Sequence, residues 1–189
     1  MENENKDFHA LPEPFDQTWK QAVDELNGVS ERACAIVGGV VLDGLLEKLL
    51  DNYLVDNADA RNDLLGSEKT APLGNFNARI VAVYAIGLIS ANNYKALKKV
   101  KEIRNRFAHD LTLTFKEPKI CKLCAKLSEL CETRRNTERT PREIFQDTVA
   151  FLAGTLDCLL YLVKTSKIKG TFKKVFKLAS DKAKYGKKI

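Results

Sequence analysis

Apolar residues recur along most of this chain at the three- and four-residue spacing that is typical of amphipathic helices. In the longest such segment, Ser30 can cap a helix that runs to about Leu54. The predicted buried face of this helix consists of Ile36, Val37, Val40, Val41, Leu45, Leu49 and Tyr53. Gly38, Gly39 and Gly44 lie inside it. Because glycine costs about 1 kcal/mol against alanine in a helix interior, we expect the close approach of another helix to compensate.

Helix-breaking residues divide the first half of the chain. A short helix is expected at about Asp16–Leu26, and Asn27-Gly28 is expected to end it. The polar stretch 56–75 is expected to be a connection that contains a short helical piece near Leu64.

Capping residues mark the starts of the later helices. The expected starts are Asn75, Ser90, Glu117-Pro118 and Thr140-Pro141, the last with Glu143 as the partner of Thr140 in a capping box. The helix that begins at Ser90 is expected to end near His109-Asp110, and the last helix near Val163. No segment has the pattern of a strand long enough to build a sheet.

Together these elements predict an all-α fold, a single compact bundle of about six or seven helices. Residues 1–15 are expected to be a flexible N-terminal segment, 16–163 the helical domain, and 164–189 a basic amphipathic tail. A length of 189 residues with 44% hydrophobic content is enough for one well-buried domain and short for two.

The positive charge is concentrated in the tail. From Lys164 onward the chain has ten lysines and a single acid, Asp181, so the tail carries a net charge of +9. Because the whole chain carries +6, the rest sums to −3 and is mildly acidic. Apolar positions at helical spacing in the tail are surrounded by Lys173, Lys174, Lys177 and Lys182. Such a helix can contact an RNA or DNA backbone or an anionic membrane. Alternatively, it can pack its phenylalanines on the bundle.

No targeting or membrane-spanning segment is recognisable in the sequence. The first ten residues are polar and acidic, unlike a secretory signal. The longest apolar stretch, Ala33–Leu50, is interrupted by Asp43, Glu47 and Lys48, so it does not suit a bilayer core of about 30 Å. We therefore expect a cytoplasmic protein without a transmembrane segment, in which the five cysteines are reduced thiols.

Three of the cysteines, Cys121, Cys124 and Cys131, have a spacing that invites comparison with a metal site. A CxxC pair with a third cysteine could supply three zinc ligands, and His109 a fourth. The same positions, with Ser128, also follow one helical stripe, where a free cysteine packs as a small hydrophobe. Because a second paired ligand set is absent, we predict core packing, and neither a metal nor a cofactor.

Candidate chemistry is concentrated in Arg104, Asn105 and His109. Asn105 and His109 are four residues apart and share a helix face, whereas Arg104 lies about 140° away from His109 around the helix. A histidine can transfer protons near neutral pH, an arginine can bind a phosphate, and an amide can orient either. These are the needs of metal-free phosphodiester cleavage by a neighbouring 2′-hydroxyl. The structural alternative is that these side chains satisfy the carbonyls and the dipole at the helix end.

The segment IRNRFAHD, residues 103–110, resembles the Arg-x4-His motif of HEPN domains, with Asn105 at the motif's polar position. That resemblance implies a helical bundle. Many HEPN proteins are ribonucleases in which Arg and His from two subunits meet at a dimer interface, and others only bind partners. Leu111 stands where some toxin–antitoxin members carry a tyrosine, so regulation through such a tyrosine is not expected.

A wider pattern, made of Pro72–Ile80, Gly87–Ile89 and Ile103–His109, resembles the mannitol-repressor (MltR) family over about residues 30–130. The family is described as transcriptional regulators without a recognisable helix-turn-helix, and none is recognisable in this sequence. The resemblance implies a regulatory protein that acts through protein partners. The alternative is a metal-independent ribonuclease of the HEPN type, in a toxin or defence role. A homodimer is expected under both hypotheses, since two-fold dimers are the commonest oligomers.

Overall fold

The computed structural model describes residues 24–54, 56–66, 71–131 and 139–165. Six helices are bounded within these residues, and they are α2 Glu31–Tyr53, α3 Ala58–Leu65, α4 Phe76–Ala85, α5 Ala91–His109, α6 Pro118–Cys131 and α7 Pro141–Thr165. No strand occurs in this part of the chain. The all-α prediction is therefore confirmed.

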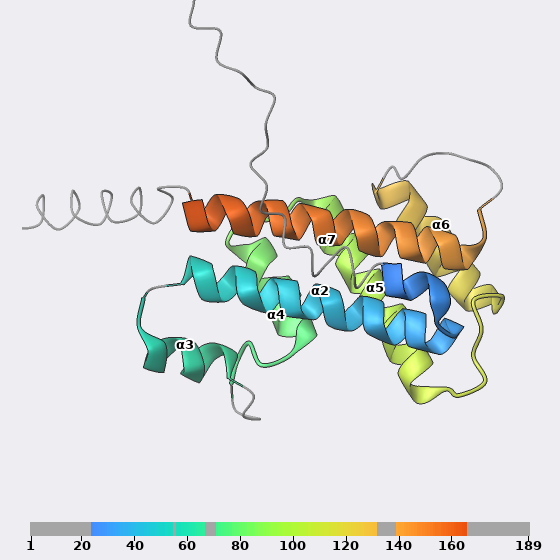
Figure 1. Cartoon of the computed structure of the whole chain (residues 1–189), viewed down its shortest axis with the longest axis horizontal. Helices are drawn as coiled ribbons and strands as arrows, with labels where there is room; N and C mark the ends of the chain where they lie inside the picture. Colours follow the sequence, from blue (N-terminus) through green and yellow to red (C-terminus); the bar gives the residue numbers. More distant parts are fainter. Residues whose placement is uncertain (1–23, 55, 67–70, 132–138, 166–189) are drawn as a thin grey trace, which may run out of the picture.

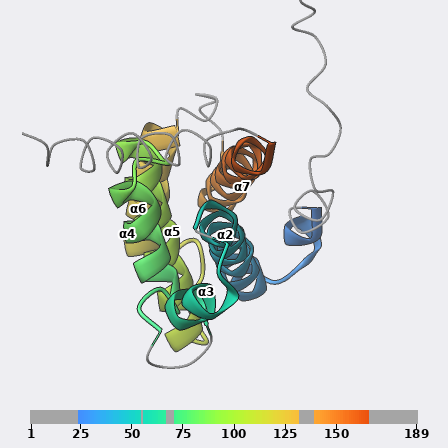
Figure 2. The ribbon, with the colours of Figure 1, turned by 90° about the vertical axis from the view of Figure 1, so that its left-hand side faces the viewer.

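The helices form two layers. Figure 2 shows α4, α5 and α6 together in one layer and α2 beside α7 in the other. The short α3 follows α2 and lies at one end of the bundle (Figure 1). Contacts between α2 and α5 and between α6 and α7 join the layers. One side of α5 remains on the surface, where Glu102, Arg106 and His109 are exposed.

Side chains from both layers meet in one core. Phe115, in the connection between α5 and α6, lies between Phe107 of α5 and Phe145 of α7, with ring centroids 4.8 and 5.4 Å away. All three rings are almost completely buried. The backbone N–H of Phe115 donates to Glu31 Oε2 at 2.8 Å, which fixes this connection to the start of α2.

Local capping signals located the starts of α2, α4, α5 and α7, whereas the cap of α3, Asn57, was not predicted. Ser30, Asn75 and Ser90 each cap a helix by accepting a hydrogen bond from a backbone N–H three residues later. Before α7, the N–H of Thr140 donates to Glu143 Oε2 at 2.8 Å, and the N–H of Glu143 donates to Thr140 Oγ1 at 3.3 Å. The predicted capping box is confirmed.

The break expected at Asn27-Gly28 lies slightly later in the chain, at Val29-Ser30, because residues 24–28 are helical. Tertiary contacts hold this helix end in place. Leu26 is fully buried, and its carbonyl accepts hydrogen bonds from Arg142 and Gln146 of α7 at 3.1 and 2.8 Å. These donors satisfy a carbonyl that a helix end leaves without an intrahelical partner. The expected helix before residue 24 lies outside the described residues.

The buried face predicted for α2 is only partly correct. Leu45 and Leu49 are buried, but Val40 is 56% exposed and Val37 is half-buried. The side that faces the core consists of Cys34, Ala35, Gly38, Gly39, Leu42, Leu45, Leu46, Leu49 and Leu50. The β-branched residues in the first half of α2 therefore lie beside the contact surface, and small residues occupy its centre.

Helix approach explains two of the three glycines of α2. A Cβ at Gly38 would lie 3.1 Å from side-chain carbons of Phe145 and Val149 in α7. A Cβ at Gly39 would lie 2.6 Å from Cγ of Arg104 in α5. Gly44 has no such neighbour within 4 Å, so close approach does not explain it.

Among the described residues, α7 is long and apolar enough to cross a membrane by length and composition, which the sequence analysis did not note. In the structure 44% of the relevant segment is buried. The helix packs against α2, α5 and α6, and its polar residues Thr148 and Asp157 are also buried. These contacts are those of a central helix of the bundle.

Candidate functional site

Two of the three predicted site residues, Asn105 and His109, line one open groove on the outward side of α5. The groove has a volume of about 490 Å³ and is lined by Lys98, Lys101, Glu102, Asn105, Arg106 and His109. His109 is exposed and Asn105 is half-buried. The four-residue spacing therefore places an amide and an imidazole side by side, as helix geometry requires.

Arg104 is not among the residues that line this groove. Its aliphatic carbons pack over Gly39 of α2, and the side chain is half-buried. One guanidinium nitrogen, Nη1, donates to Asn105 Oδ1 at 3.0 Å. The Nε atom is buried and has no hydrogen-bond partner among the described residues. Asn105 thus connects Arg104 to the groove, but the structure does not place the guanidinium beside His109.

The end of α5 is held by a residue that sequence reasoning missed. Arg32 of α2 donates from Nη2 to the carbonyl oxygen of Ala108 at 3.2 Å. Carbonyls in the last turn of a helix lack intrahelical partners, so this bond satisfies one of them. The sequence suggested that Arg104 could satisfy a carbonyl at the end of α5, but Arg32, 76 residues before Ala108, does so instead. No local sequence pattern could reveal this contact.

Beyond His109 the chain turns sharply. Asp110 Oδ1 accepts hydrogen bonds from the backbone N–H and the hydroxyl of Thr112, at 2.9 and 2.8 Å. These bonds hold the pKa of Asp110 below its usual value, because they stabilise the carboxylate. The neighbouring Arg106 forms an ion pair with Glu102 at 2.8 Å. Both charged groups beside His109 are thereby fixed in position.

The groove at His109 is adjacent to two others along α5, with which it shares lining residues. One is lined by Tyr94, Lys95, Lys98, Lys99 and Glu102 of α5 with Lys126, Glu129 and Leu130 of α6. The other extends past Arg106 and His109 to Thr112, Glu117 and Lys119. We call the surface that carries these three adjacent grooves the α5 track. The sequence signal for it was the run of four lysines between residues 95 and 101.

Two residues of the MltR-like pattern, Arg79 and Gly87, have structural roles in this chain. Arg79, only 7% exposed, donates to the carbonyl of Leu73 at 3.0 Å and forms ion pairs with Asp43 at 2.8 Å and Glu47 at 3.0 Å. This arginine attaches α4 and the preceding loop to α2. Gly87 has φ +77°, a conformation that favours glycine.

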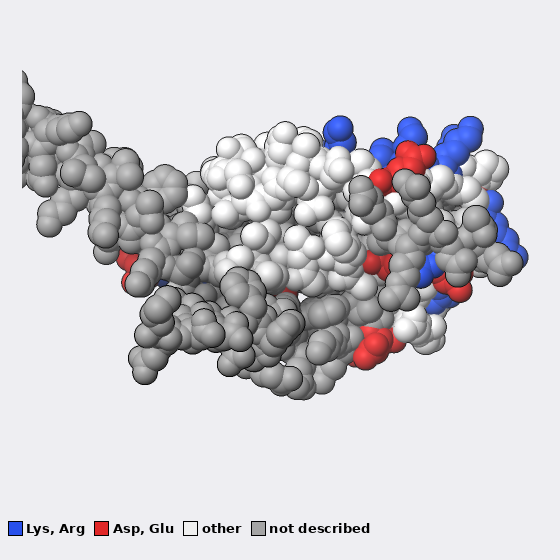
Figure 3. Space-filling view, turned by 90° about the horizontal axis from the view of Figure 1, so that it is seen from above, with Lys and Arg blue, Asp and Glu red and all other residues white. Residues whose placement is uncertain are grey.

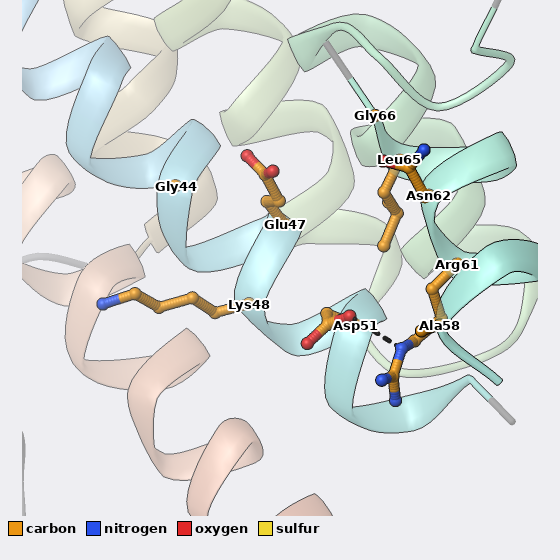
Figure 4. Close-up of a pocket in the computed structure, with 9 residues that line it drawn as sticks. All are labelled: Gly44, Glu47, Lys48, Asp51, Ala58, Arg61, Asn62, Leu65 and Gly66. Atoms are coloured by element: carbon orange, nitrogen blue, oxygen red, sulfur yellow. Dashed lines mark ion pairs between the residues drawn. The ribbon is translucent and has the colours of Figure 1, made fainter. Parts of the chain in front are cut away.

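Figure 4 shows a further groove, between α2 and α3. Its charged side chains are engaged with protein groups. Arg61 pairs with Asp51 at 3.2 Å and with Asp56 at 3.1 Å, and Glu47 pairs with Arg79. Since these charges neutralise one another, this groove is a weaker candidate site than the α5 track.

Two of the three cysteines of α6 pack in the core as predicted, whereas Cys121 is half-buried and its Sγ donates to the carbonyl oxygen of Phe115 at 3.2 Å. Cys124 and Cys131 are buried, and burial raises the pKa of their thiols to about 12 and about 11. In the part of the chain that the structure describes, no group of three or more His, Cys, Asp and Glu side chains could hold a metal ion. The predicted nucleic-acid contacts Lys173, Lys174, Lys177 and Lys182 lie outside the described residues.

Comparison with known proteins gives one result. No family model and no curated protein matches the chain. Its structure is similar to a chain in the X-ray structure of the MtlR–HPr complex from Escherichia coli, with a TM-score of 0.53, 18% sequence identity, and coverage of 77% of this chain and 98% of that chain. The two chains share a fold. The MtlR-like helical bundle expected from the sequence is thus supported at the level of architecture.

Proposed function

We propose that this chain is a regulatory protein of the MltR type that acts by binding a protein partner. The observation that carries the proposal is the shared fold, because the similar chain was crystallised in a complex of MtlR with HPr. Fold likeness alone is an analogy, so the residues of the site must support it independently. An HPr protein is the first partner to test.

The position of Arg104 supports a binding role over catalysis. Phosphodiester cleavage needs a cation at the phosphate and a proton-transfer group within hydrogen-bond reach of the reacting oxygen. Within one chain, Arg104 packs on Gly39 and bonds to Asn105, while His109 lies in the groove. This arrangement favours α5 as part of the scaffold and of a recognition surface.

Binding is tested by titrating the purified full chain with HPr from the same genome in a calorimeter. We expect saturable binding with a defined stoichiometry. Light scattering on the free chain and on the mixture would also test the expected homodimer. No heat of binding, and no increase in mass of the mixture over the free chain, at HPr concentrations up to about 100 μM would contradict HPr as the partner.

A metal-independent ribonuclease of the HEPN type is the second candidate. It is favoured by the Asn105–His109 groove and by the hydrogen bond that connects Arg104 to Asn105. In this function His109 transfers a proton, Asn105 orients the groups, and Arg104 binds the phosphate after leaving Gly39 or is supplied by a second subunit.

The two candidates are separated by incubating mixed RNA in EDTA with wild type, Arg104→Ala and His109→Ala. If wild type cleaves the RNA and neither variant does, the ribonuclease function replaces the regulatory one. RNA that stays intact with all three proteins, together with HPr binding, supports it.

A further inference from the structure

The α5 track concentrates positive charge on the described surface. It is lined by seven cationic side chains, Lys95, Lys98, Lys99, Lys101, Arg106, Lys119 and Lys126, against the carboxylates of Glu102, Asp110, Glu117 and Glu129. Glu102 is already paired with Arg106. By contrast, Figure 3 shows a described surface without charged residues over the middle of α7, whereas Lys and Arg, with Asp and Glu among them, lie toward the end where α6 lies.

Two lysines at the centre of the track converge on one neutral atom. Lys98 and Lys101 both donate from Nζ to Asn77 Oδ1 of α4, at 2.5 and 3.0 Å. Neither ammonium group forms an ion pair with a carboxylate in the described part of the chain. Two like charges held this close repel each other, and an anion bound between them reverses the sign of that interaction. The pair is therefore arranged as an anion-binding site.

A flat aromatic surface adjoins these lysines. Tyr84 of α4 and Tyr94 of α5 are stacked, with centroids 4.4 Å apart and ring planes 21° apart. Tyr84 is 41% exposed, so part of its ring is available to a ligand. Lys98 Nζ lies 5.7 Å from the centroid of the Tyr94 ring, which connects the stacked pair directly to the anion-binding lysines.

We propose that the α5 track binds single-stranded nucleic acid, with backbone phosphates at Lys98 and Lys101 and an unpaired base stacked on Tyr84. Proteins that bind single strands without sequence preference combine these two features, a basic groove and an aromatic stacking surface. The 19-residue α5 is about 28 Å long, which suits a site of a few nucleotides. An acidic polypeptide would match the charge but would leave the stacked tyrosines unused. The proposal does not depend on the regulatory function or on RNA cleavage.

The test is fluorescence anisotropy with labelled 15-nucleotide DNA and RNA strands in EDTA, with the full chain, over a range of salt concentrations. The track variant is Lys98→Gln with Lys101→Gln. Two variants serve for comparison. The first is Lys116→Gln with Lys122→Gln, an equal loss of charge at two exposed lysines that do not line the track. The second is substitution of the four tail lysines Lys173, Lys174, Lys177 and Lys182. Tyr84→Ala tests stacking, and Tyr84→Phe is its matched control because it keeps the ring.

We expect both strands to bind, and the track variant to reduce the dependence of log K on log salt by about 1.4, the value for two phosphate contacts on a single strand. Tyr84→Ala should weaken binding by about fivefold or more, whereas Tyr84→Phe should bind like wild type. The control pair should change binding much less than the track pair.

Three results would overturn the proposal. The first is equal binding by wild type and the track variant, with loss of binding only in the tail variant. The second is an unchanged affinity in Tyr84→Ala. The third is a polyglutamate competitor that displaces the strands as effectively as unlabelled oligonucleotide, which would assign the track to an acidic protein.

Discussion

Gly39 and Gly44 occupy the same helix, yet substitution by alanine should change stability in opposite directions. Both lie in the interior of α2, where alanine is favoured over glycine by about 1 kcal/mol. At Gly44 the added methyl group meets no atom within 4 Å. We therefore expect Gly44→Ala to raise the free energy of unfolding by about 0.5–1 kcal/mol.

At Gly39 the same methyl group would lie 2.6 Å from Cγ of Arg104. Cγ is close to the backbone of α5, so it cannot move aside as the end of a flexible side chain can. Overpacking of this kind costs about 1–3 kcal/mol. Because the gain in helix propensity offsets about 1 kcal/mol of this cost, Gly39→Ala should lower the free energy of unfolding by about 0–2 kcal/mol.

Urea denaturation followed by circular dichroism measures both variants, and Arg104→Ala supplies the decisive background. Without Cγ, the nearest Arg104 atom to the new methyl group is Cβ, at 3.1 Å, so most of the penalty should disappear. Gly39→Ala should then be close to neutral or stabilising in the Arg104→Ala protein. Equal stability of the two single variants, or a penalty that persists without Arg104, would refute the steric explanation.

Three further predictions concern other contacts. Arg79→Met should lower the free energy of unfolding, measured by urea titration, by about 2–3 kcal/mol. This is less than the roughly 3–5 kcal/mol lost when a fully buried ion pair is broken, because Glu47 is partly exposed. A loss below about 0.5 kcal/mol would contradict the role of Arg79 in attaching α4 to α2. Burial raises the pKa of the Cys34, Cys124 and Cys131 thiols to about 11, 12 and 11. These three thiols should therefore resist a thiol reagent at pH 8 in the folded protein and react once the chain unfolds. Rapid modification of all five cysteines in the folded protein would contradict this prediction. Hydrogen bonds from Thr140 lower the pKa of Glu143, so its stabilising effect is present above the ordinary carboxyl pKa and is lost as pH falls through the lowered value; Glu143→Gln should therefore be less stable than wild type at pH 7 and equal to it near pH 2, as thermal melts can check.

The sequence predicted those features that depend on neighbouring residues. The caps at Ser30, Asn75, Ser90 and Thr140 follow from side chains within three residues of a backbone N–H. The shared groove of Asn105 and His109 follows from their four-residue spacing on one helix. Both kinds of inference need only helix geometry, so they do not depend on how the helices pack.

The features that sequence reasoning missed depend on packing between distant segments. The rotation of α2 about its axis was mispredicted because bulky Val40 suggested the core side, whereas α5 and α7 approach over Gly38 and Gly39. The Arg32–Ala108 hydrogen bond joins residues 76 positions apart. The ion pairs of Arg79 with Asp43 and Glu47 also join distant positions, so they could not be predicted from the sequence. The family resemblance around Arg79 could therefore be recognised without knowing what this arginine contacts.

These contacts give the two sides of α5 different roles. Toward α2, Arg104 fits over Gly39, and Arg32 holds the carbonyl of Ala108. Toward solvent, Lys98 and Lys101 converge on Asn77. Arg104 packs over Gly39 whether or not any phosphate is cleaved, so the Arg-x4-His pattern alone does not establish catalysis. Stability should accordingly respond to Gly39→Ala and strand binding to the lysine pair, and each perturbation should leave the other property nearly unchanged.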